Sequence, residues 1–525
     1  MMHSFLLAIA IVAHEPGYYT SMANHVKRWL GQENVPAQVV SAQAMAGALQ
    51  KERLAFLVGF ENPTAGEMST LRAFRARGGK LVVLYSGSAV LGALMGVQPV
   101  GYSAAPYPGA WSRMDFASKI PAGLPRSVRQ TSSVLQRARP EPGKGRVLAT
   151  WSDRQGRSTG EPAWIVTGAG YWMTHLLLSD GDEDAKAQLL GAIVGSVDPK
   201  AWSLTAHTAR EAAKQRAWRD YAMRQVPRRG EIHAVWDHEG TGLYPGDWPR
   251  TFRILQDAHV TDLFVNVAGA GFAHYPSTVL PRSKTFWQEG DQLAKCLAAA
   301  KGTGIRVHAW VLTFTATRGS PNALANFAKK GWRLKTTGGK MTDYLNPSIP
   351  AVRSYMLSAI DEIVARYPVA GIHLDFIRWG DGIAKPANAA VPVSQFVTAA
   401  RQRVKRPRWL TTAVYGKYPQ CVASVGQNWA SWLDASLVDY VVPMDYTSSL
   451  QTLNELLAMQ SGTQLRRQRT IIGLGVTANE SHLDAKQVID QINLTRRYGF
   501  AGNALFDLDT TLERNVLPYL RLGLW

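Results

Sequence analysis

Acidic side chains end two apolar runs in the second half of this 525-residue chain. Asp375 lies in the run 371–379 (GIHLDFIRW), and Asp445 follows the run 438–444. Glycoside hydrolysis usually needs two carboxyl groups, one protonated and one ionised, on either side of the scissile bond. We therefore expect Asp375 and Asp445 to form a catalytic pair.

The residues near Asp375 and Asp445 suggest which of the two carboxyls is ionised and which is protonated. Side chains alternate along a strand, so His373 and Asp375 should point the same way, into a shared site. Arg378 would favour the ionised form of a neighbouring carboxyl, which makes Asp375 the anionic member. Asp445 would then be the protonated acid, with Tyr446 placed to orient it.

Residues suited to binding sugar follow the other predicted strands. Flat rings stack on pyranose faces, while carboxylates and amides bind hydroxyl groups. Each candidate has a structural alternative, such as core packing for a tryptophan or turn formation for Asn346. The residues expected to bind substrate are Asp237, Asn266, Trp310, Asn346, His373, Arg378, Trp379, Tyr415, Tyr446 and Glu480. Further candidates for the second carboxyl are Asp237, Glu239, Glu480, Asp507 and Asp509.

The predicted strands that position these residues recur along the chain at the intervals expected for a β/α barrel. Residues 230–525 are predicted to form a (β/α)₈ TIM barrel, in which function gathers at the carboxyl ends of the strands. Helical segments such as 351–366 fit between the strands. The expected strands are 232–236, 262–267, 306–312, 369–376, 408–414, 438–444, 470–476 and 502–506.

Residues 1–203 are predicted to form a separate α/β domain with a parallel sheet and helices on both faces. A helix is expected over 64–77, with Thr64 as its N-cap and Glu67 completing a capping box. The apolar run 5–13 fits either a signal peptide or a first strand, and we favour the strand. Residues 101–145 have no clear pattern, and 204–229 are predicted to be a helical linker. The remaining expected elements are a helix over 21–30, strands at 9–13, 54–59 and 81–85, and a hairpin of 146–151 with 163–167.

The amino-acid composition limits the classes of partner that we expect this protein to bind. The chain carries 58 Lys and Arg against 39 Asp and Glu, a formal charge of +19, which favours association with an anionic cell envelope. The cations are scattered and no nucleic-acid motif is found, so we expect no nucleic-acid partner. Two cysteines cannot build a disulfide framework. We expect no cofactor, no metal and no membrane span, and we expect an extracytoplasmic location.

Six motifs of the barrel region recur in order and spacing in one family: HAVW at 233–236, YPS at 275–277, VHAW at 307–310, YLNP at 344–347, the run 371–379 and PMDY at 443–446. On these motifs the barrel region resembles the bacterial glycosyl hydrolase-like 10 family. The resemblance implies a barrel glycosidase, and characterised relatives act on cell-wall glycan stripped of its peptides. We therefore expect an amino-sugar polysaccharide, such as peptidoglycan strands, as substrate. Many members have Asp where this chain has Ala370, and Ile377 stands where a chitinase-like barrel holds its general acid.

The N-terminal region is similar to the flavodoxin-like fold of class I glutamine amidotransferases, on the segment PTAGEMSTLRAFRARGGKLVVLYSGS at 63–88. Active members need a nucleophilic cysteine on a tight turn after a strand, where this chain has Tyr85-Ser-Gly87. We therefore expect an accessory domain with a structural or binding role.

Two other functions fit the sequence. The barrel could bind glycan without cleaving it, and Ile377 in place of an acid favours this. Alternatively, the N-terminal domain could hydrolyse amides or esters, and the absence of cysteine there argues against this.

Overall fold

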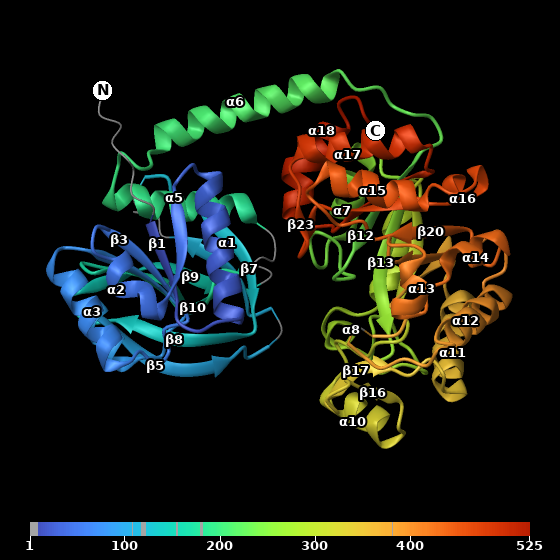
Figure 1. The fold of residues 1–525 in the computed structure, drawn as a ribbon, viewed down its shortest axis with the longest axis horizontal. Coiled ribbons are helices and arrows are strands. Elements are labelled where there is room, and N and C mark those ends of the chain that lie inside the picture. Colours follow the sequence, from blue (N-terminus) through green and yellow to red (C-terminus); the bar gives the residue numbers. More distant parts are fainter. Residues whose placement is uncertain (1–8, 108, 117–121, 154–155, 179–181, 381) are drawn as a thin grey trace. The chain divides into compact units, whose positions relative to one another are not determined.

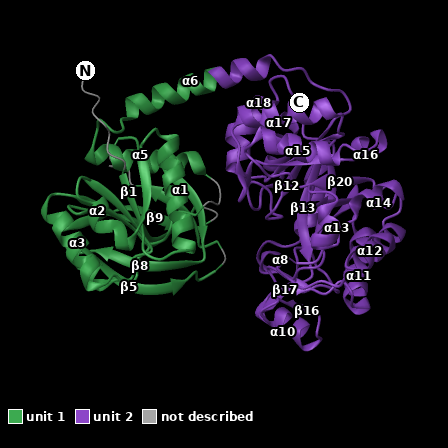
Figure 2. Ribbon diagram, viewed as in Figure 1, with its two compact units in different colours: residues 1–216 green, residues 217–525 purple. Residues whose placement is uncertain are grey.

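The computed structural model describes residues 9–107, 109–116, 122–153, 156–178, 182–380 and 382–525. The chain forms two compact units, residues 1–216 and 217–525 (Figures 1 and 2). Over the described residues, no helix has the length and apolar character needed to cross a membrane. The predicted domain bounds of 1–203, 204–229 and 230–525 stay predictions.

The larger sheet of unit 1 is parallel on one side and antiparallel on the other. The predicted strands at 9–13, 54–59 and 81–85 are confirmed, as is the hairpin. Beyond β11 the sheet is antiparallel, because β10 pairs antiparallel with both β11 and β9. In spatial order the strands are β2 (Ala37–Ser41), β1 (Ile9–Ala13), β3 (Leu54–Val58), β4 (Lys80–Leu84), β11 (Gly170–Met173), β10 (Ser158–Thr167), β9 (Gly145–Ser152), β6 (Trp111–Phe116) and β7 (Ser127–Ser132).

Helices cover both faces of the parallel part, as predicted. Ile9, Ile11 and Ala13 share a core with α1 and α5, whereas Ala10 and Val12 face α2, α3 and α4. The predicted capping box is present, since the Thr64 hydroxyl accepts from the Glu67 N–H and the Glu67 carboxylate accepts from the Thr64 N–H. The helices are α1 (Tyr18–Gln32), α2 (Met45–Ala48), α3 (Ala65–Ala76), α4 (Ala89–Met95) and α5 (Glu183–Val197), and β5 (Val97–Ala104) pairs with β8 (Val134–Pro140).

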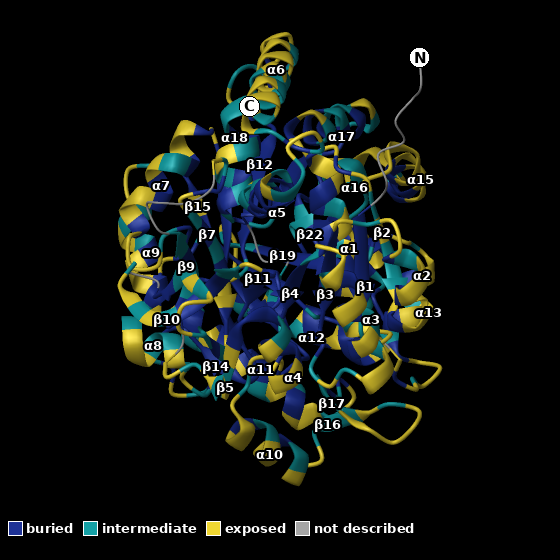
Figure 3. Ribbon diagram, turned by 90° about the vertical axis from the view of Figure 1, so that its left-hand side faces the viewer, coloured by how far each residue is buried: buried dark blue, intermediate teal, exposed yellow. Residues whose placement is uncertain are grey.

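The predicted helical linker corresponds to α6 (Leu204–Met223), which ends a few residues earlier than expected. Ala222 is its one buried residue among those described. In Figure 3 most of α6 is coloured as exposed, whereas central strands such as β1, β3 and β12 (Ile232–Asp237) are buried. The Ala, Arg, Lys and Gln content of α6 favours a helix by itself, and Trp218 and Tyr221 near its C-terminal end contact Tyr519 and Asp490.

All eight predicted strands of unit 2 are present and pair in parallel. The edge strands β20 and β21 meet through isolated parallel bridges, Val441 with Thr470 and Met444 with Gly473, so the barrel is nearly closed. In spatial order the strands are β20 (Tyr440–Pro443), β19 (Trp409–Val414), β18 (Gly371–Asp375), β15 (Arg306–Leu312), β13 (Asp262–Gly269), β12 (Ile232–Asp237), β24 (Gly502–Phe506) and β21 (Ile471–Gly475).

Helices and short hairpins fill the intervals between the barrel strands. The helices are α7 (Trp248–Asp257), α8 (Lys284–Glu289), α9 (Gln292–Ala300), α10 (Pro321–Lys329), α11 (Pro350–Arg366), α12 (Ala390–Arg403), α13 (Gln420–Val425), α14 (Trp429–Asp434), α15 (Leu450–Gln460), α16 (Gln464–Gln468), α17 (Ala485–Tyr498) and α18 (Leu517–Leu520). The short strands are β14 (Phe272–Ala273), β16 (Arg333–Lys335), β17 (Met341–Leu345), β22 (Thr477–Ala478) and β23 (Ser481–His482).

Alternation along the strands separates the barrel interior from the layer of helices. On β18, Ile372 and Leu374 pack with the helices, whereas His373 contacts the interior rings of Trp236 and Phe264. Asp375 lies on the same side as His373 and accepts from the interior Trp310. The structure thus confirms that His373 and Asp375 share a face.

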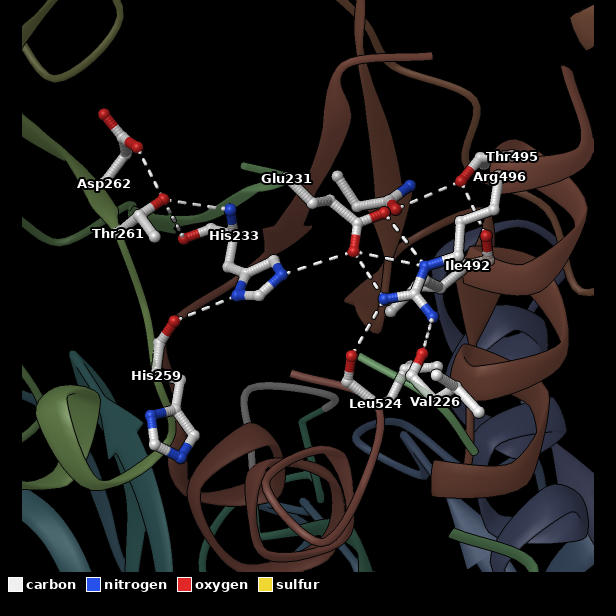
Figure 4. Close-up of polar contacts among 11 residues, drawn as sticks. Val226, Glu231, His233, His259, Thr261, Asp262, Ile492, Thr495, Arg496 and Leu524 are labelled. Atoms are coloured by element: carbon white, nitrogen blue, oxygen red, sulfur yellow. Dashed lines mark hydrogen bonds and ion pairs between the residues drawn. The ribbon is translucent and has the colours of Figure 1, made fainter. Parts of the chain in front are cut away.

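A buried ion-pair network ties the chain termini of unit 2 to the amino end of the barrel (Figure 4). Arg496 of α17 donates to Glu231 and also to the carbonyl oxygens of Val226 and Leu524. The Nε2 atom of His233 lies 3.3 Å from Glu231 Oε2. The His233 ring stacks on the ring of Trp525, with 4.6 Å between the two ring centroids. The ion pair between Glu231 and Arg496 thus connects residues from three parts of the sequence.

Candidate active site

Asp375 ends β18 at the carboxyl rim of the barrel and is almost buried, with 6% of its surface exposed. Its Oδ1 accepts from the Phe376 N–H at 2.5 Å, and its Oδ2 accepts from Trp310 Nε1 at 3.2 Å. Phe376 has a φ of 48°, which bends the chain sharply beyond the strand. The bend and the two donors hold the carboxyl in a fixed orientation.

The environment of Asp375 acts on its pKa in two directions. Burial raises the pKa, and the charge of Arg378 and the two hydrogen bonds lower it, with burial prevailing. The Arg378 guanidinium lies between the rings of Phe376 and Tyr415, at 4.3 and 4.7 Å from their centres. Arg378 therefore acts on Asp375 as the sequence suggested, but it does not fully offset burial.

Replacing Trp310 with phenylalanine is expected to shift the acidic limb of the kcat/KM profile to higher pH. The Trp310 hydrogen bond lowers the pKa of Asp375, so its loss leaves a carboxyl that ionises at higher pH. The measurement is kcat/KM against pH on a soluble glycan. Trp379→Phe is the matched control, because Trp379 donates to the Ala389 carbonyl and not to a carboxylate. Equal shifts in both variants would contradict the prediction.

Asp445 is more enclosed than its predicted role suggests. It is 1% exposed, and Gln460 Nε2 of α15 lies 2.9 Å from both carboxylate oxygens. A Cβ at Gly416 would come within 1.8 Å of Asp445 Oδ1, so the carboxyl lies against the loop after β19. Burial raises its pKa to about 7, which the Gln460 hydrogen bonds oppose. Such a carboxyl is largely protonated below neutral pH, as a general acid must be.

Tyr446 links several of the rim carboxylates. Its ring stacks on Phe506 at 5.3 Å and meets Trp236 edge-on at 6.4 Å. Burial raises the pKa of Tyr446, and nearby carboxylates raise it further, in the order Asp375, Asp507, Glu480 and Asp445. The hydroxyl thus lies in the field of both predicted catalytic residues and of two other acids.

Asp507 follows β24 and accepts a 2.8 Å hydrogen bond from Thr477 Oγ1. Burial raises its pKa to about 6, and the charge of Glu239 adds to this. Asp509 lies nearby, and burial followed by the charge of Asp507 raises its pKa. Glu480 is exposed at the same rim. The structure therefore groups three of the further candidates for the second carboxyl.

The loop after β12 is held by Asp237 and Asn266. Asp237 accepts from the N–H groups of Gly240 and Gly242, and Asn266 Nδ2 donates to the His238 carbonyl. Both side chains are buried, at 1% and 0% exposure. Burial raises the pKa of Asp237 to about 7. Their contacts position the loop, and through it His238, whose ring lies 5.8 Å from that of Trp310.

Other predicted binding residues lie away from the rim surface. His373 is fully buried, between Trp236 Nε1 at 3.0 Å and Thr411 Oγ1 at 2.8 Å. Trp379 is 3% exposed and packs in the core between barrel and helices. Asn346 accepts from the Ser348 N–H in a turn. Ile377 is fully buried in the same core as Trp379, so no acid could act from that position.

Two residues at the rim were not predicted from the sequence. Gln460 holds Asp445 but lies on a helix 15 residues later. Arg318 donates to Glu239 at 2.7 Å and to the His238 carbonyl at 3.1 Å, from a position with a φ of 73°. Neither has a local sequence signal, because both contacts depend on the tertiary arrangement of loops. Across the residues described, no group of three or more His, Cys, Asp or Glu could hold a metal ion.

Comparisons with known proteins point to the same part of the chain. Residues 249–381 match the family model described as Glycosyl hydrolase-like 10. Glycosyl hydrolase DigH from Escherichia coli (strain K12) is 29% identical over 141 residues, which cover 23% of this chain and 31% of that protein. The chain thus matches about a third of the length of its curated relatives.

Two solved structures are similar at lower identity. The glycoside hydrolase domain of PgaB (BpsB) from Bordetella bronchiseptica is 14% identical with a TM-score of 0.44, covering 56% of this chain and 99% of that one. A class V chitinase from Pseudomonas fluorescens Pf-5 is 12% identical with a TM-score of 0.38, again covering 56% and 99%. The sequence similarity to the glycosyl hydrolase-like 10 family lies within the barrel, over residues 249–381.

Proposed function

We propose that the barrel is a glycoside hydrolase that cleaves an amino-sugar glycan of the bacterial cell wall, such as peptidoglycan strands. One observation carries the proposal: Asp375 is fixed by two donors at a barrel rim lined with aromatic rings. Rings and carboxyl groups in one place are what a pyranose substrate requires. The family match and the name of the curated relative support the same class of activity.

In this proposal Asp375 is ionised and acts as nucleophile or as the base that activates water. Asp445, with a pKa of about 7, donates a proton to the leaving oxygen. Tyr446 lies in the field of both carboxyls and would orient the sugar between them. Asp507 is the rival for the acid, because it is less enclosed than Asp445 and also acts on Tyr446.

Replacing Gln460 with leucine is expected to move the alkaline limb of the kcat/KM profile upward from about pH 7. Gln460 donates to the ionised form of Asp445 and so lowers its pKa; without these bonds the acid stays protonated to higher pH. Gln491→Leu is the matched control, since this buried glutamine donates to the Thr447 carbonyl instead. Loss of activity and of the alkaline limb in Asp507→Asn, with a limb unmoved in Gln460→Leu, would assign the acid to Asp507.

The substrate is tested by measuring new reducing ends. Purified glycan strands without peptides, intact peptidoglycan and chitin are each incubated with the full chain. The proposal expects release from the peptide-free strands, with less from the other two. Release from chitin alone would contradict the proposed substrate but leave the hydrolase assignment intact.

A non-catalytic glycan-binding barrel is the second candidate. The observation that favours it is Ile377, which lies fully buried where a chitinase-like barrel holds its acid. Binding to every glycan tested with no release of reducing ends would select this function. The division into an accessory domain (1–203), a linker and a barrel is part of the proposal. So is an extracytoplasmic location, supported by the +19 charge, which suits an anionic envelope.

A further inference from the structure

The parallel part of the unit 1 sheet has a topological switch point between β1 and β3. The chain leaves β1 through α1 on one face and leaves β3 through α3 on the other face. In open α/β sheets, ligands bind at the carboxyl ends of the strands beside such a point. The residues that follow β1, β3 and β4 here include Tyr19, Glu61 and Tyr85.

Glu61 is held in place at this edge by two donors from separate elements. The Tyr19 hydroxyl donates to Glu61 Oε1, and Gln136 Nε2 donates to Oε2 at 2.9 Å. Tyr19 can approach because residue 59 is glycine, where a Cβ would lie 2.4 Å from the Tyr19 ring. Gly59 also has a φ of 73°, so both its backbone and its lack of a side chain serve this contact.

Tyr85 stands directly after β4 with a φ of 66°, a left-handed conformation that is costly for a residue with a side chain. Its ring meets that of His175 edge-on at 5.7 Å. Such outliers gather at functional sites, where the surrounding structure holds them. Burial raises the pKa of Tyr85, and the charge of nearby Glu61 adds to this.

Two exposed tyrosine rings border this cluster. Tyr18 is 59% exposed and Tyr102 is 62% exposed, and both act electrostatically on Tyr85. The carboxylates that act on Tyr19 are Glu15 and Glu61, and Glu61 also acts on Tyr85. An anionic ligand would be repelled here, whereas a neutral ligand with flat apolar faces and many hydroxyls would be matched.

We propose that unit 1 binds a neutral glycan chain at this edge of its sheet. Tyr18 and Tyr102 stack on sugar rings, and Glu61 and Gln136 bind hydroxyl groups. The site consists of unit 1 residues and does not depend on the barrel being a hydrolase. It gives the accessory unit a role in holding a polysaccharide.

The test is hydrogen–deuterium exchange of the full chain carrying Asp375→Asn, with hexameric N-acetylglucosamine, cellohexaose or peptide-free glycan strands as probe. We expect at least one probe to protect segments 14–20, 59–62 and 85–88. Tyr18→Ala with Tyr102→Ala should weaken that binding by about tenfold or more, since each ring loses a stacking contact. Glu61→Gln, which keeps the shape of the side chain, should weaken it as well.

Tyr107→Ala is the matched control, because Tyr107 is also exposed in unit 1, at 41%, but its hydroxyl contacts Asp153. It should bind like the parent chain. Absence of protection in these segments with all three probes would overturn the site, as would a double tyrosine variant that binds like the parent. Protection of segments 14–20, 59–62 and 85–88 without protection of 371–379 would support the unit 1 site. The same result would count against the proposed function of the barrel.

Discussion

Replacing Asp375 with asparagine is expected to lower kcat/KM on glycan strands by about a thousandfold, the scale of losing a positioned acid–base group. Asparagine keeps the shape of the side chain and can still accept from Trp310 or Phe376. It cannot ionise, so it can neither attack the sugar nor activate water. The measurement is initial rate by reducing-end release, with substrate affinity determined separately.

The same variant should fold normally. Burial raises the pKa of Asp375, so the ionised carboxyl does not itself favour the folded state. We therefore expect the melting temperature to stay close to that of the wild type. Asp361→Asn is the control for activity, because Asp361 is 52% exposed on α11 and pairs with Arg403. Loss of activity in both variants would show that the assay does not report on Asp375.

Replacing Glu231 with alanine is expected to destabilise the barrel by about 3 kcal/mol, the cost of removing one partner from a buried ion pair. The Glu231 side chain is 2% exposed, and its loss leaves Arg496, at 12%, without its carboxylate (Figure 4). The midpoint of unfolding in urea, with its slope, measures this. Asp361→Ala removes an exposed pair and should cost at most about 1 kcal/mol. Equal losses in the two variants would contradict the prediction.

The contribution of Glu231 depends on pH with a definite sign. Burial tends to raise its pKa, but the hydrogen bonds from His233 and Arg496 prevail and lower it. A carboxyl with a folded pKa below its unfolded value stabilises the fold above the unfolded pKa, about 4.3 for glutamate, and this is lost as the pH falls further. The difference in stability between wild type and Glu231→Ala should therefore shrink below about pH 4.3.

The barrel strands were predictable because parallel strands are buried on both faces and form continuous apolar runs. Strand β18 and the capping box at Thr64 show how much local pattern alone can specify. Strands β2 and β5 were not predicted, because both are only partly buried and mix polar with apolar residues. Their positions depend on pairing with distant strands.

The site was less predictable than the fold. Residue type and strand position placed Asp375 and Tyr446 at the rim, but could not indicate how enclosed each side chain is. Asp445 is held by Gln460, which lies on a different element, and Trp379 turns into the core. Such details follow from long-range packing rather than from spacing along the chain.

The proposed hydrolysis of glycan through Asp375 can be tested by chain-length analysis, by mass spectrometry, of peptide-free glycan strands incubated with wild type and with Asp375→Asn. We expect shortened strands with the wild type, and strands that are bound but unshortened with the variant. Strands left intact by the wild type, or shortened equally by both proteins, would rule out hydrolysis through Asp375.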